Sequence, residues 1–154
     1  MLFRSHRAYK WSPSHPEADT VSIYDALLEP GLTARQALIN QALAGHPALR
    51  AAVQNLLSLT QRSAANPAPM LLRVSDENTP RLSLDLNLYP AELTMGAVAP
   101  ELRHLAACCG VTPARFEHWL ERFASLSLGH LAAGLGRQGQ AFVTLYGGMQ
   151  EWVQ

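Results

Sequence analysis

The 154-residue sequence is poor in charged residues and contains no long apolar run. Its 12 basic and 12 acidic side chains cancel, so the chain has no general electrostatic attraction for nucleic acid. No apolar stretch reaches the length that spans a bilayer, and no apolar segment follows the basic N-terminal residues as a secretory signal requires. We therefore expect neither a nucleic-acid partner nor a membrane.

Cysteine is almost absent. The two cysteines, Cys108 and Cys109, are adjacent in the sequence. Neighbouring cysteines rarely bridge each other because the required geometry is strained. The sequence therefore contains no disulfide framework, and a reducing cytoplasm is the expected location.

Apolar residues make up 48% of the chain, which is enough for the core of one small globular domain. Residues 1–18 are polar and include Pro13 and Pro16, so we expect a flexible N-terminal arm there. The rest of the chain, residues 19–154, is expected to be a single domain.

Helical patterns occur in two pairs. The first pair covers about 34–44 and 47–61, after a short helical turn at 23–28. The second pair begins at Pro100 and at Pro113, two prolines suited to the first turn of a helix. Apolar residues at helical spacing carry these assignments.

Strand patterns follow each helix pair. Leu82, Leu84, Leu86 and Leu88 alternate with polar residues, which is typical of a strand with one buried face. We interpret 70–75 and 81–89 as one β-hairpin. A second hairpin is expected at 128–135 and 140–146, with its turn among the glycines between them.

The order of these elements predicts an α+β fold. Two tandem helix–hairpin units would form an antiparallel sheet of about four strands, with helices packed on one face. The other face of the sheet would be polar.

Three motifs that could suggest chemistry have structural explanations. The glycine pattern at 134–139 precedes a strand, so a hairpin turn explains it better than nucleotide binding. His104 and Cys108 are four residues apart, but a zinc site needs more ligands than these two. Glu117, His118 and Glu121 are typical of a solvated helix face. We expect no metal and no cofactor.

The polar sheet face offers a candidate site for a small anionic ligand. Arg73, Arg81, Tyr89 and Tyr146 could converge there and bind an anion such as diphosphate through charge-assisted hydrogen bonds. The alternative is a face that is simply covered by water.

The second half of the chain resembles a helix–hairpin unit of the aromatic (indole) prenyltransferases of the αββα-barrel type. The resemblance is carried by Leu86-Asn87-Leu88-Tyr89 and by Phe142-Val143-Thr144-Leu145-Tyr146, with the segment Gly129-His130-Leu131. It implies that Tyr89 and Tyr146 contact a prenyl diphosphate. Asn87 stands where the family has a lysine, and a full barrel needs about twice this length.

Two classes of function remain open. The first is a small-molecule binding protein or prenyltransferase-like transferase half, with an anionic, isoprenoid diphosphate or aromatic ligand and a pocket completed by a second chain. The second is a non-catalytic adaptor or chaperone-like domain that binds a protein partner through Trp11, Met149 and Trp152. Both classes predict a homo- or hetero-oligomer.

Overall fold

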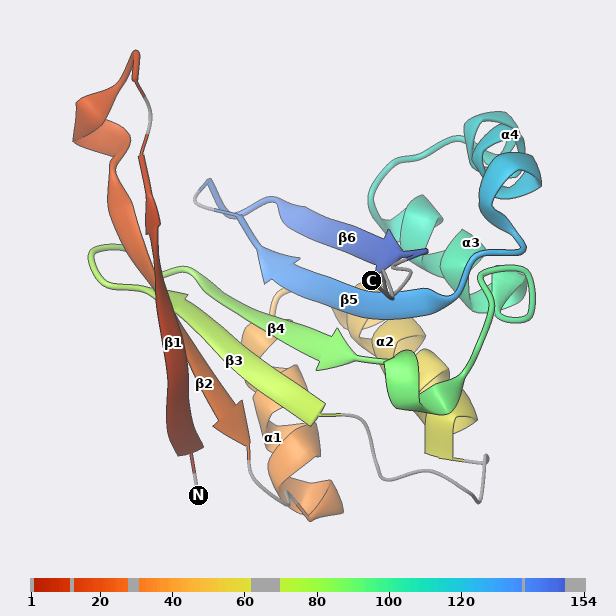
Figure 1. The fold of residues 1–154 in the computed structure, drawn as a ribbon, viewed down its shortest axis with the longest axis horizontal. Coiled ribbons are helices and arrows are strands. Elements are labelled where there is room, and N and C mark those ends of the chain that lie inside the picture. Colours follow the sequence, from red (N-terminus) through yellow and green to blue (C-terminus); the bar gives the residue numbers. More distant parts are fainter. Residues whose placement is uncertain (1, 12, 28–30, 62–69, 137, 149–154) are drawn as a thin grey trace, which may run out of the picture.

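The computed structural model describes residues 2–11, 13–27, 31–61, 70–136 and 138–148. Within these residues, pairs of strands alternate with pairs of helices (Figure 1). The strands are β1 (Leu2–Lys10), β2 (Thr20–Leu27), β3 (Met70–Asp76), β4 (Leu82–Asn87), β5 (Leu128–Leu135) and β6 (Ala141–Gly147). The helices are α1 (Leu32–Ala42), α2 (Pro47–Gln61), α3 (Ala99–Cys108) and α4 (Pro113–Phe123), with short 3₁₀ turns η1 (Pro16–Ala18) and η2 (Tyr89–Ala91).

The strands form one antiparallel sheet in the order β1-β2-β3-β4-β5-β6. Each strand therefore pairs only with its neighbours in the sequence. The expected hairpins are present as β3–β4 and β5–β6, and the four expected helices lie between and before them. The α+β class with an antiparallel sheet is confirmed.

The strand number was predicted wrongly, because the sheet has six strands rather than four. The segment interpreted as an arm contains β1, and the segment interpreted as a helical turn lies in β2. In β2, Val21 and Ile23 alternate with Ser22 and Tyr24, and β-branched residues at this spacing favour a strand over a helix. In β1, polar residues dominate because the strand lies at an edge of the sheet.

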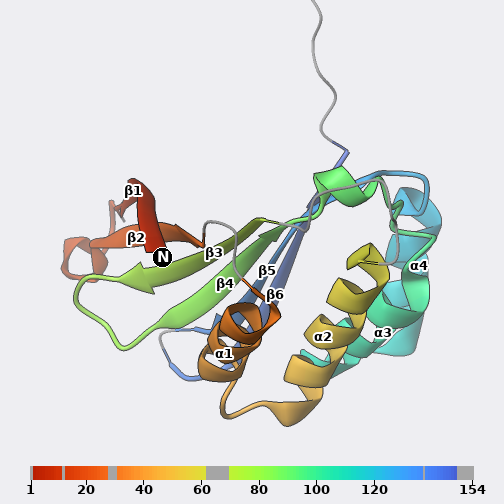
Figure 2. The same cartoon turned by 90° about the horizontal axis from the view of Figure 1, so that it is seen from below.

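The two faces of the sheet have different neighbours. The four helices lie on the same side of the sheet (Figure 2). Leu84, Leu86 and Leu131 are fully buried and belong to one core with apolar residues of the helices, among them Leu56 and Leu102. Burial of such side chains contributes about 1.5–3 kcal/mol each. This core holds the central strands in place, and with them the residues of the opposite face.

Among the described residues, no helix combines the length and the apolar character that crossing a bilayer requires.

Candidate functional site

The sheet face opposite to the helices, here called the open face, is defined by the strand register. Residues that are paired across neighbouring strands point to the same side of the sheet, so all residues in phase with Asp85 belong to this face. In β2 to β6 they are Ser22, Tyr24 and Ala26 of β2, Met70, Leu72, Val74 and Asp76 of β3, Ser83, Asp85 and Asn87 of β4, His130, Ala132 and Gly134 of β5, and Phe142, Thr144 and Tyr146 of β6.

An aspartate–histidine pair lies on the open face. The Oδ1 atom of Asp85 in β4 lies 2.8 Å from Nδ1 of His130 in β5. Both side chains are mostly buried, with exposed fractions of 15% for Asp85 and 29% for His130. A carboxylate at Nδ1 fixes the orientation of the imidazole ring.

Two tyrosines flank this histidine. Tyr89 lies in η2, directly after β4, and its ring meets that of His130 edge-on at a centroid distance of 5.6 Å. Tyr146 of β6 lies opposite His130 in the register, at a centroid distance of 6.4 Å. The Tyr89 hydroxyl is buried and has no hydrogen-bond partner among the described residues.

A hollow of about 530 Å³ lies over these groups, lined by Asp85, Tyr89, His130, Leu145, Tyr146 and Gly147. Its size falls within the range of small-molecule sites. Of the four residues proposed from the sequence, the structure brings Tyr89 and Tyr146 together here.

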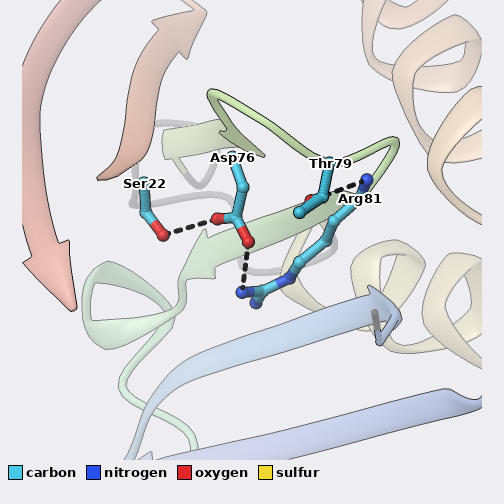
Figure 3. Close-up of polar contacts among 4 residues, drawn as sticks. All are labelled: Ser22, Asp76, Thr79 and Arg81. Carbon is cyan, nitrogen blue, oxygen red and sulfur yellow. Dashed lines mark hydrogen bonds and ion pairs between the residues drawn. The ribbon is translucent and has the colours of Figure 1, made fainter. Parts of the chain in front are cut away.

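Arg81 lies at the other end of β4, before its first residue. Asp76 lies between Ser22 and Arg81 (Figure 3): its Oδ1 accepts a 2.6 Å hydrogen bond from the Ser22 hydroxyl, and its Oδ2 is 3.5 Å from Nη1 of Arg81. The Arg81 guanidinium also lies over the ring of Phe142, 5.3 Å from its centroid. The positive charge of Arg81 is therefore largely balanced by a buried carboxylate.

Arg73 does not join the other three residues. It is paired with Leu84, a core residue on the helix side, and with Asp25 of β2. Its Nη2 atom donates to Oδ2 of Asp25 at 3.2 Å. The expected convergence of Arg73 on the polar face is corrected by this register, because one position along a strand changes the face.

Tyr24 of β2 also lies on the open face. Its ring stacks on that of His6 at a centroid distance of 4.1 Å. Burial raises the pKa of Tyr24, Arg81 opposes this shift, and Tyr146 raises the pKa further. Leu72 and Val74 on this face are buried, at 8% and 4% exposure.

The sequence places Asp85 among the polar residues that alternate with the leucines of β4 but gives it no role. It uses His130 in the resemblance and as a possible metal ligand that has no diagnostic spacing. The alternation of leucines in β4 identifies the face of Asp85. Nothing local identifies its partner, because the pair depends on the β4–β5 register between residues 45 positions apart.

A second hollow, of about 310 Å³, lies on the helix side of β6. Its walls are mostly apolar and come from α3, α4 and β6, with Phe116, Trp119, Val143 and Leu145 among them. Cys109 also lines it, and burial raises the pKa of its thiol, while a hydrogen bond from the Val143 backbone N–H opposes the shift. A raised pKa disfavours the thiolate form of Cys109.

No group of three or more histidine, cysteine, aspartate or glutamate side chains within the described ranges is arranged to hold a metal ion. Of the residues expected to serve a protein-binding function, Trp11 is 68% exposed. Met149 and Trp152 lie outside the described residues.

Comparison with known proteins identifies no relative of this chain: no family model, no curated protein and no solved structure matches it.

Proposed function

We propose that this protein binds a small aromatic molecule in the hollow of the open face, with His130 as its hydrogen-bond acceptor. The observation that carries the proposal is the 2.8 Å contact between Asp85 and His130 beneath a hollow bordered by Tyr89 and Tyr146. A histidine held at Nδ1 by a carboxylate leaves Nε2 to accept a hydrogen bond. The favoured ligand therefore carries an N–H or O–H donor.

The tyrosines supply the rest of the recognition. Aromatic rings prefer edge-to-face or offset contacts, worth about 0.5–1.5 kcal/mol beyond the area they bury. Tyr146 is 50% exposed and offers such a surface to a ligand ring. The unpartnered hydroxyl of Tyr89 can donate to a polar group on the ligand.

The charges near the hollow favour an aromatic ligand over a diphosphate. Arg73 points to the helix side, and Arg81 is engaged by Asp76. No lysine or arginine is among the described residues that line the hollow. A diphosphate needs several cationic partners at close range.

A prenyltransferase-like transferase half is the second candidate. Pairs of strands alternate with pairs of helices, and the two tyrosines that the resemblance selects line one hollow. In such an enzyme, His130 would take the proton of an aromatic acceptor, and the diphosphate would need cations supplied by another chain.

The experiment is an NMR titration of the full chain with indole and, separately, with geranyl diphosphate. Indole is expected to shift the His130 ring signals and to raise the unfolding temperature. At a free indole concentration of 100 times its Kd, binding would add about 2.7 kcal/mol to the free energy of unfolding. A response to geranyl diphosphate instead would favour the transferase candidate.

A matched pair of variants tests the position of the ligand. Ala132 pairs with Asp85, which lines the hollow, so Ala132→Leu is expected to narrow the site from beside it and weaken the response. Ala37, an exposed residue of α1, provides the control Ala37→Leu, which should retain it. Absence of any His130 shift with either probe at millimolar concentration would overturn the proposal.

A further inference from the structure

The outer edge of β6 is the uncharged edge of the sheet among the described residues. Both β1 and β6 end the strand order. In β1 the edge contains Arg7 and Lys10 and is interrupted by a register shift between Arg4 and His6. Charges and bulges of this kind prevent edge-to-edge pairing. The sequence of β6, Ala-Phe-Val-Thr-Leu-Tyr-Gly, has neither a charge nor a proline, and among the described residues β6 pairs with a strand on one edge, with β5.

Hollows lie on both sides of this edge. The apolar hollow beside α3 and α4 is lined by Val143 and Leu145, and the hollow of the open face is lined by Leu145 and Tyr146. Leu145 borders both. A strand added to β6 would direct alternate side chains toward the two hollows, as in recognition by strand addition.

The sequence of β6 is complementary to itself in antiparallel orientation. With Thr144 at the centre, Val143 lies opposite Leu145, Phe142 opposite Tyr146, and Ala141 opposite Gly147. Aliphatic residues thus meet aliphatic residues on the helix side, and aromatic residues meet on the open face. Cross-strand pairs of these kinds contribute roughly 0.2–1 kcal/mol each.

We propose that two copies of this chain associate through their β6 strands, paired antiparallel about Thr144, into one continuous twelve-stranded sheet. Such a contact is isologous, so both copies use the same surface. The occupant is a second copy rather than an unrelated peptide because the strand matches itself residue by residue. A neutral strand on a chain of zero net charge also meets its copy without repulsion.

The pairing would also contribute a residue to the ligand site. Phe142 of the second copy would lie opposite Tyr146, at the border of the hollow that contains His130. In the single chain, the Val143 N–H donates a hydrogen bond to the thiol of Cys109, which is a weak acceptor. A backbone carbonyl of the second copy's β6 can replace this thiol. The association itself does not depend on the proposed ligand.

The test uses charge at the centre of the pairing. Thr144 is exposed, so Thr144→Lys and Thr144→Glu should fold normally, which circular dichroism would verify. Light scattering and sedimentation are expected to give twice the chain mass for the unmodified protein and the single mass for each variant. Mixing the two variants should restore the dimer, because lysine then lies opposite glutamate. Thr33→Lys, at an exposed threonine of α1, is the control and should remain dimeric.

Each outcome is informative. A monomer at every protein concentration would overturn the proposal and leave β6 to a different partner. A dimer that persists in Thr144→Lys would place the contact elsewhere. Failure of the mixed variants to associate, with each alone monomeric, would overturn the register about Thr144. No ligand is added, so these results are separate from those of the indole titration.

Discussion

The ring of Tyr89 lies against the backbone of Gly129, in the space that a β-carbon at position 129 would occupy. The adjacent main chain is fixed as well, since the Leu88 N–H donates to the Gly129 carbonyl at 2.7 Å. Because residue 129 has no side chain, the ring of Tyr89 can pack against the backbone there and lie beside His130.

Gly129→Ala is expected to displace Tyr89 and to lower the free energy of unfolding by about 1–3 kcal/mol, the usual cost of overpacking. The measurement is chemical denaturation, with the near-ultraviolet spectrum reporting the tyrosine environment. Gly45→Ala is the matched control, because no atom lies within 4 Å of a β-carbon there. Equal stabilities for the two variants would contradict this account of Gly129.

The contact of Asp76 with Ser22 and Arg81 joins strands β2, β3 and the start of β4. Arg81→Met is expected to cost about 3–5 kcal/mol, because it removes one partner of a buried ion pair. Ser22→Ala should cost about 1.5–3 kcal/mol, the range for a hydrogen bond to a charged group. Chemical denaturation measures both. Adding Asp76→Asn to Arg81→Met should recover part of the loss, and a further decrease would refute this explanation.

Tyr24 is expected to ionise above its ordinary pKa of 10.0, chiefly because it is partly buried. A raised pKa in the folded state means that the protonated phenol stabilises the fold. This contribution is complete below the unfolded-state pKa and is lost as the pH rises toward the folded-state value. Spectrophotometric titration should show a late-ionising tyrosine that disappears in Tyr24→Phe. The variant should also lose less stability at alkaline pH than the unmodified protein.

The Arg103 guanidinium on α3 holds the pKa of Glu117 on α4 below its usual value, through a hydrogen bond between the side chains. The resulting stability is present above the unfolded-state pKa and is lost as the pH falls through the folded-state pKa. The effect on stability should be small, because the pair is exposed. Carboxyl NMR titration is expected to show the Glu117 pKa rising in Arg103→Met, and an unchanged value would contradict the pairing.

Much of the architecture follows from local patterns. The leucines of β4 alternate over several residues, and Thr112-Pro113 precedes an amphipathic helix, so these elements were predictable. The β1–β2 hairpin was not predicted, because its outer strand, β1, has polar residues on both faces. Its second strand also carries Asp25 in phase with Ile23 and Leu27, which weakens the alternation.

The candidate site was only partly predictable, for a related reason. Adjacent Leu71 and Leu72 in β3 are both buried, on opposite faces, so the sequence does not reveal which face Arg73 occupies. The pairing of Arg73 with Leu84 places Arg73 on the helix side of the sheet. The Asp85–His130 contact likewise depends on register across a helix pair, which periodicity within one strand cannot supply.

The order of the strands has a consequence for how the chain folds. Because every strand pairs with a sequence neighbour, three hairpins can form early and independently, and only the β2–β3 and β4–β5 pairings must wait for closure of a loop containing two helices. Closing a loop costs conformational entropy, and the cost is larger for a longer loop. These two pairings close the longest loops, so they are the expected kinetic bottlenecks. The β4–β5 step is also the one that assembles Asp85 with His130, so binding competence should emerge late during refolding.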